Sequence, residues 1–534
     1  MPILRYLENP LDDLLRRAAA RGGDAPAVTT ARTTLTFAAL DREADRIAHA
    51  VRRLASRPDA VVAAAASLDA VFPAVYYGTI RSGHLLALVD PLTGPAALHE
   101  ILTTAAAEIA FVPTALAEVL VKLEDQLPHL RTIVVTDAVD EVTPGSALAL
   151  STALAGAPDT PLRTGPPADV DGVACLHFTP HAHTPTGLRA VRFSHRNLIA
   201  GAAQTAIAHG LDATSVTVNH LPFYHPAHLN AAVHAGAWQV LCADPAPWAG
   251  IALAARVGAG HYYGLASRLA RLAADRRFAP GHPDLPGPEL RAVLCGGTPL
   301  EPAIARRLRD VLGAPVLQGY GLSEVCTLSH HQVPGSRPDL GAVGVPLPGT
   351  ECRVVAPAGR QPVAVWSTGE VEIRGPQLTA GCGADGWLST GDVGYLDEDG
   401  GLYVVDRLGS VFTCDDVLIA PSLIERVIGE DPRVAECVVA DWPDPARGAL
   451  VWAGVVLRPA VPARDPRGLL DTLDSIAEAA NARLSAGERI RRLEALDTIP
   501  RTPTGTPARH HIRTRLQALS TAESTPTHPT PAGV

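Results

Sequence analysis

The chain of 534 residues contains very little lysine, methionine and aromatic side chain. Lysine occurs only at Lys122, so 44 of the 45 basic residues are arginine. Methionine also occurs once, aromatic residues make up 4% of the chain and charged residues 19%. Chemistry that needs a lysine amine therefore has a single candidate in the whole chain.

Long apolar runs, basic stripes and paired cysteine motifs are also missing. Apolar runs such as residues 61–68 are far shorter than the roughly 18 residues that span a bilayer, so no membrane span is expected. The net charge of −10 and the absence of a Lys/Arg run argue against a nucleic-acid partner. Eight cysteines without a C-x-x-C motif, and an N-terminus without an apolar signal segment, predict a cytoplasmic protein with reduced thiols.

Apolar residues make up 47% of the chain, which is enough to build large hydrophobic cores. Its length predicts two to four units. Apolar spacing predicts a helix over 36–55, preceded by a short hairpin of 26–28 and 33–35. Buried strands are expected at 109–112 and 132–136. This alternation of strands and helices predicts an α/β fold with parallel sheet.

Changes in composition divide the chain into three parts. A large N-terminal domain at 1–407 is expected to consist of layered α/β subdomains, with a β-rich subdomain at about 341–405. A small α/β domain is expected at 408–518, and the resemblance that its motifs carry, given below, implies that this domain is mobile. The final segment, 519–534, has no apolar periodicity and is predicted to be a disordered tail.

Six short segments then follow one another in a specific order. They are 221–225 (LPFYH), 295–300 (CGGTPL), 318–324 (QGYGLSE), 387–392 (WLSTGD), 403–407 (YVVDR) and 501–513 (RTPTGTPARHHIR). Together they resemble the adenylate-forming superfamily of AMP-binding enzymes, which includes acyl- and aryl-CoA ligases, luciferases and peptide-synthetase adenylation domains. The resemblance extends from about residue 36 to residue 513.

The resemblance implies a nucleotide site. Asp392 would accept hydrogen bonds from the ribose hydroxyls and Arg407 would add a charge-assisted bond, although the two could instead form a structural ion pair. Tyr320 would stack on adenine, or be an ordinary core tyrosine. The remaining nucleotide-binding candidates are glycines of the same segments: Gly296, Gly297 and Gly319.

The resemblance also implies a catalytic site. Glu324 would hold Mg²⁺ near a phosphate of ATP or AMP, or be a solvated loop acid. His225 would gate the acyl site, or be a structural histidine. Acid-binding residues would come from scattered positions between about 225 and 327. Cys326 is a possible thiol nucleophile, but a buried structural role is the favoured interpretation.

The ATP loop departs from the pattern of the superfamily. Its candidate residues are Thr179, Thr184, Thr186, Gly187 and Arg189, with one glycine and two prolines in a loop about two residues too long. Backbone N–H groups cradle phosphate most easily where glycine allows close approach, and proline has no N–H to donate. Arg189 could replace the loop lysine, but the sequence predicts a weakened phosphate cradle.

Two further departures lie near the C-terminus. Thr506 follows a glycine at the position of the superfamily's catalytic lysine, so a charge that would stabilise adenylate formation is missing. Gly409 occupies the hinge, where glycine widens the accessible backbone conformations. Separately, His177, His181 and His183 could form a metal site, although a rebuilt loop without a ligand is the favoured interpretation.

Three functions remain open. The residues that depart from the superfamily pattern are those expected to bind and activate ATP. This favours an acyltransferase that takes a pre-activated thioester or adenylate. The first alternative is an AMP-forming acyl- or aryl-acid ligase with Mg²⁺ and ATP. The second is a non-catalytic partner of an acyl carrier or a related enzyme. In each enzymatic case the expected partners are a small carboxylic acid, or its activated form, and CoA or the phosphopantetheine of an acyl carrier protein.

Overall fold

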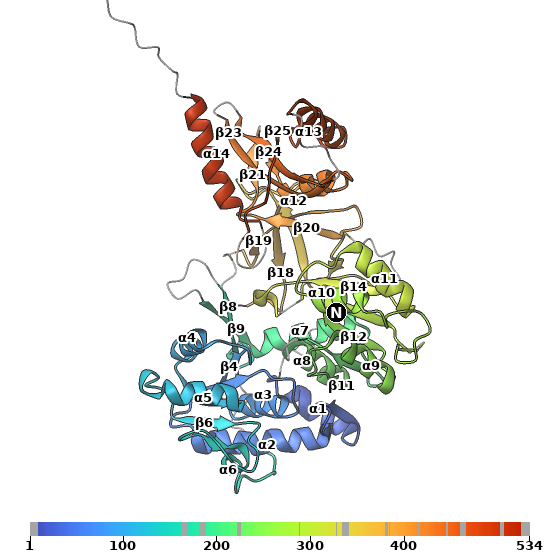
Figure 1. Ribbon diagram of the computed structural model, residues 1–534. Helices are drawn as coiled ribbons and strands as arrows, with labels where there is room; N and C mark the ends of the chain where they lie inside the picture. The colour runs from blue at the N-terminus through green and yellow to red at the C-terminus, as the bar shows by residue number, and fades with distance from the viewer. Residues whose placement is uncertain are drawn as a thin grey trace, which may run out of the picture. The chain divides into compact units, whose positions relative to one another are not determined.

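A computed structural model divides the chain into two compact units (Figure 1). One comprises Met1–Cys352 and Ile373–Leu388, and the other Arg353–Glu372 and Ser389–Val534. The described residues are 9–162, 169–180, 188–221, 226–287, 289–326, 328–333, 341–379, 383, 385–414, 417–444, 447–459, 466–501 and 507–524. The α/β class is as predicted, with a large N-terminal unit and a smaller C-terminal one. The predicted boundary at residue 407 stays a prediction.

The first unit contains a seven-stranded sheet in the order β7-β6-β5-β3-β4-β8-β9. Its strands are β3 (Val61–Ala65), β4 (Leu85–Val89), β5 (Ala107–Val112), β6 (Thr132–Val135), β7 (Leu148–Ala149), β8 (Val173–Pro180) and β9 (Leu188–Ser194). All neighbours are parallel except β8 and β9, which form an antiparallel pair. Every residue of β3 and β5 is buried, as expected for parallel strands covered on both faces. The strands predicted at 109–112 and 132–136 are confirmed.

The second sheet of this unit has nine strands in the order β16-β15-β14-β13-β12-β10-β11-β1-β2. They are β1 (Pro26–Thr29), β2 (Thr34–Thr36), β10 (Val216–Asn219), β11 (Trp238–Leu241), β12 (His261–Leu265), β13 (Ala292–Gly296), β14 (Val316–Tyr320), β15 (His330–His331) and β16 (Val345–Pro346). The predicted β1–β2 hairpin is present and antiparallel. Strands β12, β13 and β14 are parallel, so their carboxyl ends lie at one edge of the sheet.

Helices separate the strands of both sheets. They are α1 (Asp13–Gly22), α2 (Phe37–Leu54), α3 (Val71–Arg81), α4 (Pro95–Ala105), α5 (Thr114–Lys122), α6 (Leu150–Ala153), α7 (His195–Ala208), α8 (Pro226–Ala235), α9 (Pro247–Val257), α10 (Ala266–Ala274) and α11 (Pro302–Leu312). The predicted helix at 36–55 is α2, which begins where the Thr36 hydroxyl accepts a hydrogen bond from the Ala39 N–H at 3.2 Å. No helix in the described ranges is both long and apolar enough to cross a bilayer.

The segment predicted to be β-rich contains strands and no helix among its described residues. After β16 come β17 (Glu351–Val355), β18 (Gly369–Arg374), β19 (Leu388–Leu396) and β20 (Leu402–Arg407). They form a four-stranded sheet in chain order. In the β19–β20 hairpin, Asp392 is directly opposite Arg407.

The C-terminal part of the chain has its own α/β core. Its elements are β21 (Phe412–Cys414), β22 (Val417–Ile419), α12 (Pro421–Gly429), β23 (Val434–Asp444), β24 (Gly448–Leu457), α13 (Pro466–Asn481), β25 (Ile490–Ala495) and α14 (Arg509–Ser524). Strands β23 and β24 are antiparallel and β25 joins them in parallel. Helix α14 continues past residue 518, where the tail was predicted to begin. The rest of that predicted tail, 525–534, lies outside the described residues.

A buried arginine holds the first three helices together. Arg81 has no solvent-exposed side-chain area, and its guanidinium contacts Asp12 at 3.4 Å, Asp41 at 2.5 Å and Asp45 at 3.0 Å. These aspartates lie just before α1 and on α2. Removing this cation would leave the buried Asp12 and Asp45 with Arg16 as their one remaining described arginine and would take Arg81 away from Asp41, which is costlier than breaking an exposed pair.

We therefore expect Arg81→Met to lower the free energy of unfolding by about 3–5 kcal/mol. The control is Arg309→Met, since Arg309 forms an exposed pair with Asp310 and should change stability by less than about 1 kcal/mol. Urea unfolding followed by circular dichroism checks both values. Equal effects of the two variants would contradict this account of the core.

Candidate functional site

An ion pair joins the two sides of the predicted phosphate region. Arg189 Nη1 lies 3.4 Å from Glu324 Oε1, and the Glu324 side chain is only 19% exposed. Glu324 lies in the 3₁₀ turn η3 (Ser323–Val325), and its carbonyl accepts a hydrogen bond from the Thr379 N–H at 3.0 Å. The carboxylate proposed for a cation is thus held in place by an arginine.

The hairpin β8–β9 leads into and out of the predicted ATP loop. Thr179 is directly opposite Arg189, and Pro180 is opposite Leu188. Both Thr179 and Arg189 are therefore strand residues rather than loop residues. The rest of the predicted loop, Thr184, Thr186 and Gly187, lies outside the described residues.

The proposed histidine metal site is only partly described. His177 is on β8, and burial lowers the pKa of its imidazole, with Glu324 opposing the shift. His181 and His183 lie outside the described residues. Within the described part of the chain, no cluster of three or more His, Cys, Asp or Glu side chains could hold a metal ion.

The glycines predicted at the nucleotide site lie where the strands end. Gly297 has a φ of +89°, which side-chain-bearing residues rarely adopt. At Gly319 a Cβ atom would lie 2.7 Å from Leu328 Cδ2, so any other residue there would have to displace the Leu328 side chain. Tyr320 ends β14, and its ring centroid is 5.9 Å from that of His330.

The predicted ribose ligands form an ion pair in the second unit. Arg407 Nε lies 2.8 Å from Asp392 Oδ1 across the β19–β20 ladder. Asp392 is buried, whereas the Arg407 side chain is 70% exposed. Asp392 and Arg407 therefore form the ion pair that the structural interpretation describes. A role in binding ribose would use the same two side chains.

Gly409 follows this pair in the predicted hinge. Its carbonyl accepts a hydrogen bond from Arg513 Nη1 at 3.1 Å. The φ of Gly409 lies outside the left-handed region, and a Cβ there would meet no atom within 4 Å. The backbone conformation at residue 409 therefore does not require glycine. The wider range of backbone angles that glycine allows would matter only in another conformation of the hinge. The predicted Thr506 and His225 lie outside the described residues.

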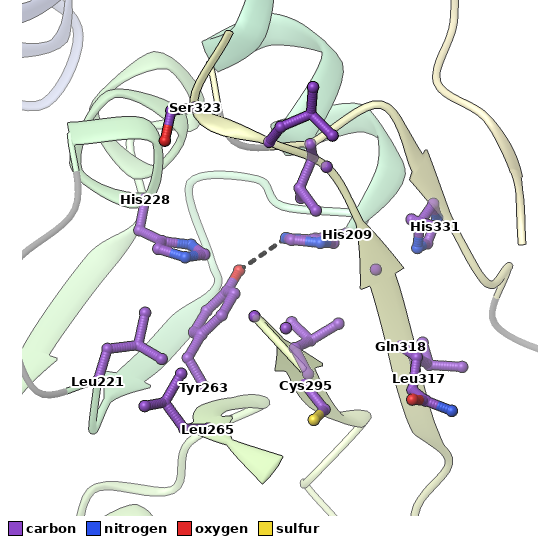
Figure 2. A pocket seen from close by; sticks show the side chains of 17 residues that line it. His209, Leu221, His228, Tyr263, Leu265, Cys295, Leu317, Gln318, Ser323 and His331 are labelled. Atoms are coloured by element: carbon purple, nitrogen blue, oxygen red, sulfur yellow. Dashed lines mark hydrogen bonds between the residues drawn. The ribbon is translucent and has the colours of Figure 1, made fainter. Parts of the chain in front are cut away.

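A cavity of about 270 Å³ opens at the carboxyl ends of β12, β13 and β14 (Figure 2). Ligands of open α/β sheets bind at this edge. Six leucines make most of its apolar wall: Leu221, Leu265, Leu294, Leu317, Leu322 and Leu328. Gly296, Gly297, Gly319 and Ser323 also line it. Ser323 precedes Glu324, so the cavity adjoins the Arg189–Glu324 pair along the chain.

Three histidines and a tyrosine supply polar groups to the cavity. His209 Nδ1 lies 3.0 Å from the Tyr263 hydroxyl, and the ring of His331 meets that of His209 edge-on at 5.6 Å. His228 packs on the other side of Tyr263, with ring centroids 4.7 Å apart (Figure 2). The sequence analysis missed His209 and His331 because they lie outside residues 225–327. No motif marks them.

Burial keeps the histidine side chains of the cavity uncharged at neutral pH. It lowers the pKa of His228 and of His331 to about 4, and it lowers that of His209 further below the usual value with the help of neighbouring histidines. Burial also raises the pKa of the Cys295 thiol to about 12. Cys326 is buried with its thiol pKa raised, as the structural interpretation predicted. Neither thiol is therefore an activated nucleophile.

The comparisons with known proteins decide the family. The AMP-binding enzyme profile matches residues 15–382, and the profile of the AMP-binding enzyme C-terminal domain matches residues 423–506. The chain belongs to the AMP-binding enzyme family. The resemblance seen in its six sequence motifs is confirmed.

Relatives of this AMP-binding enzyme align along nearly its whole length. The fatty acid–[acyl-carrier-protein] ligase ScoC of Streptomyces coeruleorubidus is 30% identical over 520 residues, which cover 92% of this chain and 93% of ScoC. The scaffold is thus that of acyl-CoA and acyl-carrier-protein ligases.

Solved structures share the fold of this AMP-binding enzyme. The anthranilate CoA ligase AuaEII, in complex with anthranoyl-AMP, has a TM-score of 0.75 at 20% identity over 96% of this chain and 98% of that one. The amide bond synthetase McbA of Marinactinospora thermotolerans has a TM-score of 0.73 at 23% identity over 95% of this chain and 100% of that one.

The neutral histidines generate a prediction about pH and stability. Because the folded pKa of His331 is about 4 and the unfolded value about 6.5, the unfolded chain takes up a proton that the folded chain does not. This contribution is fully present above pH 6.5 and is lost as the pH falls through 4. It amounts to about 3 kcal/mol for each such histidine.

We expect the unfolding free energy to fall between pH 7 and pH 4, and to fall less steeply in His331→Phe. Urea unfolding at several pH values measures both slopes. The exposed His129, mutated to Phe, serves as the control and should leave the slope unchanged. Equal slopes for wild type and His331→Phe would contradict the lowered pKa.

Proposed function

We propose that this AMP-binding enzyme is an AMP-forming acid ligase. It converts a small carboxylic acid and ATP to an acyl adenylate and pyrophosphate, and then passes the acyl group to a thiol of CoA or an acyl carrier protein. The observation that carries the proposal is the near full-length match to a ligase of this type, ScoC. The leucine-walled cavity beside Glu324 supports it from the geometry.

In the proposed first step, a carboxylate oxygen attacks the α-phosphorus of ATP and pyrophosphate leaves. The acid lies in the cavity, whose apolar walls exclude water that would hydrolyse the adenylate. Its carboxylate end would face Ser323 and Gly297, next to Glu324. In the second step, the acceptor sulfur attacks the acyl carbon and AMP leaves.

The residues around Glu324 fit a magnesium ion. Glu324 offers one partly exposed carboxylate, and Mg²⁺ is commonly held by one or two carboxylates together with substrate phosphates and water. Bound there, the ion would neutralise charge on the phosphates. Arg189 would then be released from Glu324 to contact a phosphate oxygen, in place of the family's loop lysine.

The other site residues keep their implied roles within the proposal. Tyr320, with Gly296, Gly297 and Gly319, would contact the adenine. In the second unit, Asp392 and Arg407 would bind the ribose hydroxyls. Arg407 is exposed enough to exchange partners. The described cysteines are all free, which supports a reducing, cytoplasmic location.

A second candidate is acyl transfer from a pre-activated thioester or adenylate without adenylation. One observation favours it: Arg189 pairs with Glu324, the carboxylate that a cation would need. The sequence analysis ranked this function first. The relatives named above reverse that order, since each is a ligase or a synthetase.

Exchange of labelled pyrophosphate into ATP, measured with a panel of aryl and fatty acids, tests the proposal. We expect at least one acid to support exchange, and Glu324→Gln to lower its rate by about 100-fold or more. The control is Glu43→Gln, which removes a half-exposed pair with Arg46 on α2 and should leave exchange unchanged.

Thermal shifts with ATP, AMP and CoA separate the remaining outcomes. Stabilisation by AMP or CoA without any exchange would overturn the ligase proposal in favour of acyl transfer. The absence of both exchange and nucleotide stabilisation would indicate a non-catalytic partner of an acyl carrier.

A further inference from the structure

A tyrosine and a histidine in the wall of the cavity form a hydrogen-bonded pair. The Tyr263 hydroxyl lies 3.0 Å from His209 Nδ1, and the two side chains point toward one another (Figure 2). Both residues line the cavity, with Tyr263 5% exposed and His209 6% exposed. Neither side chain makes another hydrogen bond within the described part of the chain. The pair therefore keeps hydrogen-bonding capacity that these residues do not use.

The donors of this pair can be counted for either tautomer of the histidine. Burial lowers the pKa of His209 well below its usual value, so the imidazole is neutral near pH 7. A phenol has one O–H and a neutral imidazole has one N–H, so the pair has two donors. The bond between the two side chains uses one of them. One donor is therefore left over in both tautomers, either on His209 Nε2 or on the Tyr263 hydroxyl.

The preceding residue of β12 belongs to a similar pair whose second donor is used. The Tyr262 hydroxyl lies 2.8 Å from His220 Nδ1, and His220 Nε2 lies 2.7 Å from the backbone carbonyl oxygen of Asp244. Successive side chains of a strand point to opposite faces, so this pair does not share the cavity of its neighbour. The Tyr262–His220 pair is thus complete without a ligand.

The pair in the cavity has no such acceptor. His209 Nε2 is unpaired among the described residues, yet it is not one of the fully enclosed unpaired atoms found there, so it keeps accessible surface. Most of the described cavity wall is leucine and glycine, whose side chains accept no hydrogen bond. Buried donors are almost always hydrogen-bonded. A molecule in the cavity is therefore expected to supply the acceptor.

The strand register places the pair away from the reacting end of the acid. Tyr263 lies two residues before Leu265, which pairs with Gly296. At about 3.3 Å per residue, Tyr263 is roughly 7 Å further from the carboxyl edge of the sheet than Leu265 is. The proposed position of the carboxylate is at that edge, beside Gly297. The pair thus meets the end of the acid that is remote from the carboxylate.

Resting on the proposed function, we infer that the acid activated here carries an oxygen atom remote from its carboxylate, which accepts a hydrogen bond from the Tyr263–His209 pair. A hydroxyl or ketone oxygen meets this requirement, whereas a methyl group does not. A hydrocarbon acid displaces water from the pair and leaves its donor unpaired, which lowers the affinity. Tyr263 and His209 are thus specificity-determining residues for the remote end of the acid.

Calorimetric titration of the full-length protein without ATP tests this inference. Each oxygen-bearing acid is compared with a hydrocarbon acid of similar shape. The benzoate pairs are 4-hydroxybenzoate with 4-methylbenzoate, and 4-acetylbenzoate with 4-isopropylbenzoate. The chain pairs are 8-hydroxyoctanoate with nonanoate, and 8-oxononanoate with 8-methylnonanoate. On at least one of these two scaffolds, we expect both oxygen-bearing acids to bind about ten-fold tighter than their partners.

Variants of the pair test the donor count. Tyr263→Phe and His209→Phe each leave one donor, so each should keep part of the preference for oxygen. The double variant has no donor and should bring the affinity ratio of each pair close to one. The matched control is Tyr262→Phe, which removes the hydroxyl of the complete pair on the same strand and should leave the ratio unchanged.

The wild-type affinities alone can overturn the inference, so it does not depend on the folding of a variant. Hydrocarbon acids that bind as tightly as their oxygen-bearing partners on both scaffolds would contradict it, as would the absence of binding on both. An undiminished preference in the double variant would contradict the assignment to Tyr263 and His209. A preference for oxygen without pyrophosphate exchange would leave the recognition of oxygen standing and contradict the ligase proposal instead.

Discussion

The parallel register of β12, β13 and β14 is the constraint on which the candidate site depends. Leu265 pairs with Gly296 and Cys295 with Gln318, so the three strands end at the same edge. The chain leaves that edge through Gly297 on one side and through Gly321–Glu324 on the other. Because Gln318 also fixes Leu300 and Gln332, the loops that border the cavity are tied to the sheet itself.

Both carboxylates that the family assigns to ligands are held by arginine. Glu324 pairs with Arg189, and Asp392 pairs with Arg407. In each pair the arginine is the more exposed partner, so it can exchange its contact while the carboxylate keeps its position. A lysine-poor chain thus still presents oriented charges, since the guanidinium binds carboxylate and phosphate alike.

Much of this fold could be predicted from the sequence because local patterns carry it. The amphipathic spacing of α2 and the turn between β1 and β2 are local signals, and six ordered motifs identified the family. The cavity was harder to predict from the sequence than the fold. His331 reaches it only because a two-residue strand turns back onto β14, and the Arg189–Glu324 pair joins residues 135 positions apart. Such contacts depend on long-range pairing, which one sequence does not reveal.

The motif comparison also gave more weight to residues that depart from the superfamily pattern than to side chains that make contacts in their place. Thr179 and Arg189 read as members of a damaged loop, yet they lie opposite each other on β8 and β9, and Arg189 extends to Glu324. Gly409 read as a loosened hinge, yet its carbonyl is bound by Arg513. A motif compared letter by letter does not show which side chains can take over a missing contact.

Transfer of an oxygen label from acid to AMP tests the central claim most directly. An acid labelled with ¹⁸O in its carboxylate is incubated with the protein, ATP and a thiol acceptor, and the AMP is analysed by mass spectrometry. If an acyl adenylate forms, one labelled oxygen appears in AMP. Thioester formation with unlabelled AMP, or with no AMP at all, would contradict the assignment as an AMP-forming ligase.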